Sequence, residues 1–159
     1  MAPDTTATRF AGVAAGTSAA DAVAGRAKIF EMTQAAEDAV LRPKDAGAWP
    51  HTLRAALAAR IAALNEEHDL AAHFAADAGA DATLADPAQG GAVPVMAAVV
   101  AFMDRVAADT RHVTADDVKD LQAAGVADAD IVRLAELNAF LAYQIRVIAG
   151  LRLMGGMPA

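Results

Sequence analysis

The chain has 159 residues, no cysteine and a net charge of −7. This length fits one domain, which can bury a core without the help of a metal or a disulfide. The acidic balance and the lack of a dense Lys/Arg cluster argue against nucleic-acid binding and against an anionic membrane surface, so we expect neither partner. The missing cysteines exclude disulfides, thiolate catalysis, thiol redox cycling and thiolate metal sites.

The sequence also predicts a cytoplasmic location. Residues 10–20 are small and uncharged but lack the leucine-rich segment of a secretory signal. The most apolar stretch, 137–153, is interrupted by Arg146 and Arg152, so it falls short of the roughly 18–20 uncharged residues of a membrane span. Hydrophobic residues make up 56% of the chain and aromatic residues only 4%, so alanine, valine and leucine supply the apolar content. Such a composition favours packed helices and is typical of chains that bury surface in an oligomer.

The first half of the chain shows two helical patterns. Residues 1–17 are rich in Thr, Ala and Gly without periodicity, and we expect a flexible or loosely docked tail. A helical pattern then runs from 18 to about 41 and stops at proline and glycine residues. Trp49, which precedes the next helix, is expected in the core. That helix carries one apolar stripe at i, i+4, i+8 and i+11, formed by Leu53, Leu57, Ile61 and Leu64.

Two helices and a loop are predicted next. Asn65 marks a helix boundary, because asparagine caps helices well. A second helix follows over 66–78, and its acidic first turn suits the positive end of the helix dipole. Residues 79–91 have the composition of a loop. Pro94 stands where proline is favoured, in the first turn of a helix that continues to about residue 109.

The last part of the chain predicts a short helix and a long one. Thr114 to Asp117 resembles a capping box with Asp in place of Glu, and Gly125 is expected to end the short helix in a left-handed conformation. The final helix, 129–153, is apolar almost all round, so it should be central to the core or shared between subunits. The predicted fold is an all-α bundle of about six helices in one domain, residues 18–155.

The segment 66–73, EEHDLAAH, is the candidate site. It places two of the four histidines of the chain beside three carboxylates. On a regular helix Glu66, Asp69 and His73 lie at i, i+3 and i+7 and share one face, whereas His68 points elsewhere.

This segment resembles the AhpD/carboxymuconolactone decarboxylase family, whose members carry Cys-x-x-Cys-x-x-x-His at the start of a helix. Glu66 stands in the place of the first cysteine and Asp69 in that of the second. His73 matches the family histidine, and His68 precedes the second cysteine position, where AhpD itself has histidine. The relay glutamate of the family, about twelve residues earlier, corresponds to Arg54.

The flanking sequence extends the resemblance over about residues 26–153. LRAALAARIAALN is similar to the helix before the family motif, and VTADDVKDLQAAGVADADIVRLAELNAFLAYQIRV is similar to a later segment and the final helix. The resemblance implies an AhpD-like bundle that assembles with copies of itself, from a dimer to a hexamer. The family's peroxidase needs an activated thiolate and a resolving cysteine. We therefore expect no thiol peroxidase activity from this chain.

Three interpretations of the segment remain open. In the first, its histidines are satisfied at the edge of the core, its carboxylates are a solvated helix start, and the protein is a structural, non-catalytic family member. In the second, His73 is a general base oriented by Asp69, and Arg54 binds the carboxylate of a small carboxylic acid. The carboxymuconolactone decarboxylases act on a lactone acid without redox thiols, so the resemblance allows such proton transfer. A salt bridge from Arg54 to Glu66 or Asp69 is the structural alternative for that arginine.

In the third interpretation the same segment binds a metal ion. Asp69 and His73 at i, i+4 can ligate one ion, with Glu66 as a third ligand, although the sequence offers no clear ligand from elsewhere. No glycine-rich phosphate loop occurs in a strand–helix setting, so we expect no organic cofactor.

Overall fold

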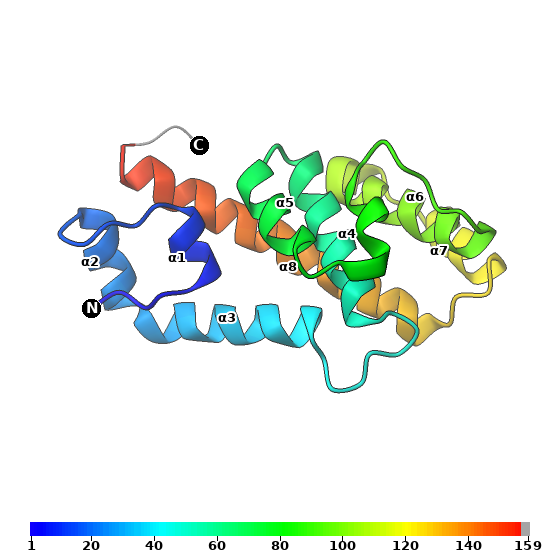
Figure 1. Ribbon diagram of the computed structural model, residues 1–159, viewed down its shortest axis with the longest axis horizontal. Helices are drawn as coiled ribbons and strands as arrows, with labels where there is room; N and C mark the ends of the chain where they lie inside the picture. The colour runs from blue at the N-terminus through cyan, green and yellow to red at the C-terminus, as the bar shows by residue number, and fades with distance from the viewer. Residues whose placement is uncertain (157–159) are drawn as a thin grey trace. The chain divides into compact units, whose positions relative to one another are not determined.

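The computed structural model describes residues 1–156, and it confirms the all-α prediction because helices are the only regular elements in this range (Figure 1). The chain forms two compact units. The first unit combines Met1–Ala39 with the described residues that follow Leu141, and the second unit is Val40–Leu141. The sequence predicted one domain from residue 18 onward, with no such division.

The first unit contains three short or medium helices and the second half of a long one: α1 (Thr6–Phe10), α2 (Ser18–Gly25), α3 (Ala27–Leu41) and α8 (Asp128–Met154). Helix α1 lies within the segment that the sequence presented as a flexible tail. Its start is a capping box in which the backbone N–H of Thr5 donates to Thr8 Oγ1 (2.9 Å) and that of Thr8 donates to Thr5 Oγ1 (3.3 Å). Threonine hydroxyls thus order a segment that has no apolar periodicity.

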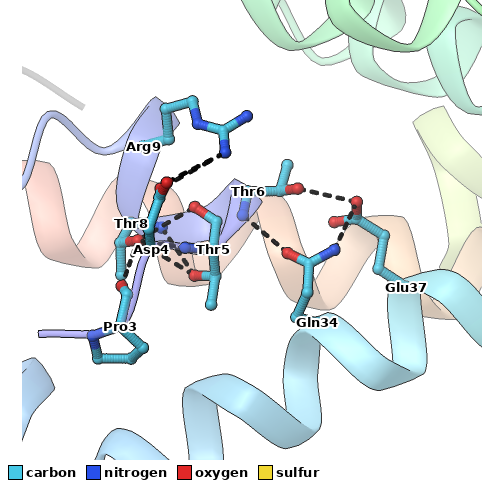
Figure 2. A network of polar contacts seen from close by, with 8 residues as sticks. All are labelled: Pro3, Asp4, Thr5, Thr6, Thr8, Arg9, Gln34 and Glu37. Atoms are coloured by element: carbon cyan, nitrogen blue, oxygen red, sulfur yellow. Dashed lines mark hydrogen bonds and ion pairs between the residues drawn. The ribbon is translucent and has the colours of Figure 1, made fainter.

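Polar contacts attach α1 to the rest of the first unit (Figure 2). Thr6 donates through its backbone N–H to Gln34 Oε1 and through its hydroxyl to Glu37 Oε1, each at 2.8 Å. Glu37 is 1% exposed, and its other oxygen accepts a hydrogen bond from Gln144 Nε2 of α8. At the end of α1, Phe10 O accepts from Arg152 Nη2 of α8 at 3.1 Å. Buried polar groups therefore join α1, α3 and α8 within this unit.

The second unit surrounds α4 (His51–Leu64) with α5 (His68–Ala75), the 3₁₀ helix η1 (Gly79–Ala85) and α6 (Pro94–Asp109). The sequence predicted one apolar stripe on α4, but every residue from 53 to 62 is buried. Alanines fill the positions between the leucines, so neighbouring elements approach this helix from several sides. The 3₁₀ helix η1 also occupies half of the segment that composition presented as a loop.

The unit is completed by the 3₁₀ helix η2 (Thr110–His112), α7 (Ala115–Ala123) and the first half of α8. The local signals of the sequence are confirmed here. Pro94 opens α6, and Thr114 and Asp117 form the predicted capping box of α7. Gly125 has a φ of 90°. Trp49 is buried, and its indole N–H donates to Asp130 O at 2.8 Å.

Helix α8 is the long apolar helix that the sequence predicted at the core or between subunits, and it has buried residues in both units. It exposes Val132 in the second unit and Tyr143 and Leu153 in the first. By length and composition α8 is also the one helix in residues 1–156 that is able to cross a membrane, and 44% of its most apolar window is buried inside the protein. The core helix of a soluble protein passes the same test.

Candidate functional site

The α4–α5 connection changes the geometry expected for the segment 66–73. Helix α4 ends at Leu64 with Asn65 as its C-cap, and α5 begins only at His68, after Glu67 as its N-cap. Glu66 lies between the two helices with a φ of 63°. The predicted helix over 66–78 therefore starts too early, and the helical face on which Glu66 was to join Asp69 and His73 does not form.

Backbone hydrogen bonds explain why the chain turns at this point. The N–H of Glu66 donates to Ala63 O (3.0 Å), and the N–H of Glu67 donates to Ala62 O (2.9 Å). These two bonds are the Schellman motif, which satisfies the last carbonyls of a helix and requires a left-handed residue after the C-cap. Completing the end of α4 thus removes Glu66 from α5.

The remaining members of the segment lie on α5 in different environments. Asp69 and His73 are four residues apart on this helix, as predicted, with Asp69 exposed and His73 half-buried. The His73 ring packs against Phe74, with 5.2 Å between the ring centroids. His68 is exposed, whereas Glu67, which the sequence analysis did not select, is buried. The segment thus brings one carboxylate and one imidazole to the same side of α5.

Metal ligation gains no support from this arrangement. Within residues 1–156, no group of three or more His, Cys, Asp or Glu side chains is placed so as to hold an ion. Glu66, Asp69 and His73 therefore do not form the three-ligand set that the sequence allowed. Displacement of Glu66 by the left-handed turn accounts for this result.

Arg54 lies on α4 in an environment that the sequence did not reveal. It is 3% exposed and donates from Nε to Trp49 O (2.9 Å), from Nη1 to Val40 O (2.8 Å) and from Nη2 to Ala46 O (3.0 Å). Burial lowers the pKa of its guanidinium from the ordinary value, and the nearby positive charge of Arg133 adds to this effect. The structure shows Arg54 holding the chain between α3 and α4, and its described hydrogen bonds include neither Glu66 nor Asp69.

A second buried arginine on α4, Arg60, was not selected from the sequence. It is 2% exposed and binds both carboxylate oxygens of Asp104 on α6, at 2.5 Å from Nε and 2.7 Å from Nη2. Its remaining hydrogen bonds go to four backbone carbonyls, those of Leu84, Asp86, Pro87 and Gln89. The signal in the sequence is an arginine inside an alanine-rich helix, because a buried guanidinium needs several acceptors.

The comparisons with known proteins add no assignment: no family model, no curated protein and no solved structure matches this chain. The site is thus described by its own groups. Asp69, His68 and Glu66 face water, and His73 lies at the edge of the core beside Phe74. The two arginines of α4 bind backbone carbonyls. Arg54 holds the connection between α3 and α4 in place, and Arg60 holds the segment 84–89.

Proposed function

We propose that this chain is a cysteine-less helical protein of the AhpD-like type, which acts as a structural or binding protein and assembles with copies of itself. The observation that carries the proposal is the environment of Arg54. An acid/base enzyme acting on a small carboxylic acid would direct this arginine toward the substrate beside His73 and Asp69. Instead, each guanidinium nitrogen of Arg54 donates a hydrogen bond to a backbone carbonyl.

The position of Glu66 supports the same proposal. Glu66 precedes α5 and is exposed to solvent. Helical spacing therefore does not place its carboxylate on the side of α5 that carries Asp69 and His73. General acid/base catalysis depends on groups held within hydrogen-bond reach of the reacting atoms. His73 with Asp69 as a general base stays an alternative prediction, and the next experiment separates it from the structural role.

The test is a ligand and metal survey of the purified protein. Elemental analysis is followed by thermal-shift screening of small carboxylic acids and lactones on the wild type, on His73→Ala and on His112→Ala as the matched control. His112 is an exposed histidine that hydrogen-bonds Asp109, and both residues lie outside the segment 66–73. We expect no stoichiometric metal and no ligand whose stabilising effect depends on His73. A stabilising acid that loses its effect in His73→Ala and keeps it in His112→Ala would overturn the proposal.

Self-association is supported by large apolar side chains that the first unit leaves in water. Ile29 and Met32 on α3 are 44% and 58% exposed, and Leu153 on α8 is 63% exposed. Tyr143 of α8 is also partly exposed, and its hydroxyl lies 2.9 Å from Thr33 Oγ1 of α3. Exposed apolar residues on adjoining helices are typical of surfaces that pack against another protein. A second copy of this chain is the partner that we propose.

A further inference from the structure

The segment 84–89 contains an Asp–Pro peptide bond in an exposed turn. Asp86 and Pro87 both lie at the surface directly after η1, so water reaches the bond between them. The nitrogen of Pro87 belongs to a tertiary amide and carries no hydrogen. Such a nitrogen accepts a proton more readily than an ordinary peptide nitrogen and is the better leaving group. The bond after Asp86 is therefore more easily broken than its neighbours.

Two hydrogen-bond donors converge on the carbonyl oxygen of this bond. Arg60 Nη1 lies 2.8 Å from Asp86 O, and the backbone N–H of Gln89 donates to the same oxygen at 3.0 Å. The ion pair with Asp104 holds the buried guanidinium of Arg60 in this position. Donors fixed on a carbonyl oxygen stabilise the negative charge that develops there when the carbon is attacked. The fold thus supplies the carbonyl of Asp86 with an oxyanion hole.

The carboxyl group of Asp86 is held beside the same bond. Its Oδ1 accepts a hydrogen bond from the backbone N–H of Ala88 at 2.9 Å. The ring that this hydrogen bond closes contains the carbonyl carbon of Asp86 and the nitrogen of Pro87. Attack of a carboxyl oxygen on that carbon closes a five-membered ring, and groups held this near each other react as if at very high concentration. Asp86 therefore carries both an activated carbonyl and its nucleophile.

From this arrangement we infer that the protein cleaves its own chain between Asp86 and Pro87. The carboxyl group of Asp86 transfers its proton to the nitrogen of Pro87, and a carboxyl oxygen attacks the main-chain carbonyl carbon. The C–N bond breaks, its electron pair stays with the nitrogen, and Asp86 becomes a cyclic anhydride. One water molecule then opens the anhydride to two carboxyl groups. The products are residues 1–86 and 87–159.

The two donors on Asp86 O distinguish this site from an Asp–Pro bond in an unfolded chain. Acid slowly cleaves Asp–Pro bonds of any sequence, because the carboxyl group and the proline nitrogen are always adjacent. Unfolding keeps those two groups but separates Arg60 from Asp86. Loss of a single oxyanion donor typically slows a reaction by roughly 100–1,000-fold. The inference therefore predicts faster cleavage in the folded state, and it is independent of the function proposed above.

The experiment follows cleavage of the full chain at pH 5 by intact-mass spectrometry, with and without concentrated urea. We expect fragments that end at Asp86 and begin at Pro87, formed at least about tenfold faster by the folded protein. Circular dichroism verifies that the chain without urea stays folded. The comparison leaves Arg60 unchanged, which matters because this side chain also holds the segment 84–89. Equal or slower cleavage of the folded chain, or no cleavage at this bond, would overturn the inference.

Variants test the two reacting groups. Asp86→Asn removes the attacking carboxyl group but keeps an oxygen that accepts the N–H of Ala88, so it should fold normally and cleave about tenfold more slowly or less. Pro87→Ala restores an ordinary peptide nitrogen and should also slow the reaction. Asp45→Asn is the matched control, because Asp45 is an exposed aspartate whose Oδ1 accepts the N–H of Gly47 in the same way. It should leave the rate unchanged, whereas cleavage of Asp86→Asn at the rate of the wild type would contradict the inference.

Discussion

Glu66 and Gly125 occupy the same position in two helix ends of the same kind. Each is the left-handed residue after a C-cap, with φ values of 63° and 90°. After α7, the N–H of Gly125 donates to Gln122 O (2.9 Å) and that of Val126 to Leu121 O (3.0 Å), as the corresponding groups do after α4. Glycine adopts this conformation without strain, whereas a residue with a Cβ does not. The end of α4 therefore carries a strain that the end of α7 avoids.

Glu66→Gly should stabilise the protein. It removes a left-handed penalty of roughly 1–2 kcal/mol, part of which is offset because glycine gains about 0.4–1 kcal/mol of chain freedom in the unfolded state. We expect a net gain of about 0.5–1 kcal/mol in the free energy of unfolding, measured by urea denaturation. Since Glu66 is exposed, its side chain has no buried contact to lose.

The control is the opposite substitution at the matching position: Gly125, the left-handed residue after α7, is replaced by alanine. No heavy atom beyond its chain neighbours lies within 4 Å of a Cβ built on Gly125, so Gly125→Ala meets backbone strain alone. This variant should lose about 1 kcal/mol. Equal stabilities of wild type and Glu66→Gly, together with the expected loss in Gly125→Ala, would show that Glu66 gains a compensating contact that relieves its strain.

The difference between these two helix ends also shows what the sequence was able to predict. Gly125, and the capping box of Thr114 with Asp117, were predictable because each signal lies within a few residues. At Glu66 two local signals compete, since acidic residues also favour the first turn of a helix. The helix start predicted at Glu66 depended on that second signal. Asp69 and His73 were placed correctly on one helix because their spacing is not affected by where α5 begins.

The acceptors of the two buried arginines could not be predicted from the sequence for another reason. Arg54 and Arg60 bind backbone carbonyls, and every residue has the same C=O group, so no side-chain pattern marks these acceptors. Helical content follows from composition and periodicity, whereas these contacts depend on the tertiary structure.

Arg60→Met should destabilise the protein strongly. The substitution removes the guanidinium that donates to Asp104 and to four backbone carbonyls of the segment 84–89, and it leaves a partly buried carboxylate without this arginine. Breaking a buried ion pair by removing one member costs about 3–5 kcal/mol, and we expect a loss of this size in urea denaturation. Hydrogen exchange should accelerate in the segment 84–89.

Arg111→Met is the control for Arg60→Met. Arg111 is largely exposed and lies 3.9 Å from Asp109 Oδ1, so its loss should change stability by less than about 0.5 kcal/mol. A loss in Arg60→Met no larger than that of this control would contradict the role of Arg60 as the anchor of the segment 84–89.

The capping box of α7 predicts a specific dependence of stability on pH. The backbone N–H and the hydroxyl of Thr114 hydrogen-bond the carboxylate of Asp117 and hold its pKa below the usual value of 3.8. A carboxyl whose pKa is lower in the folded state stabilises the fold above the usual pKa, and this contribution is lost as the pH falls through the folded-state pKa. Acid should therefore weaken α7.

The variant Asp117→Asn measures this contribution. The difference in urea midpoint between wild type and Asp117→Asn should be largest near neutral pH and should shrink below pH 3.8. Asp116→Asn is the control, because it removes a carboxylate from the same first turn without breaking the bonds to Thr114. A difference between wild type and Asp117→Asn that is the same at pH 6 and at pH 3 would refute the prediction.

If the exposed apolar residues of the first unit form the self-association surface, a charged side chain at position 32 should weaken the oligomer. In Met32→Glu a carboxylate replaces an apolar side chain on the exposed side of α3, and burying that charge between two copies is costly. Sedimentation velocity over a range of concentrations should show an oligomer for the wild type and a shift toward the monomer for Met32→Glu. Ala101→Glu adds the same charge to an exposed position of α6 in the second unit and should leave the oligomer intact. A wild type that is monomeric at every concentration would exclude this surface as a self-association site, and an oligomer weakened equally by both variants would indicate a general effect of charge.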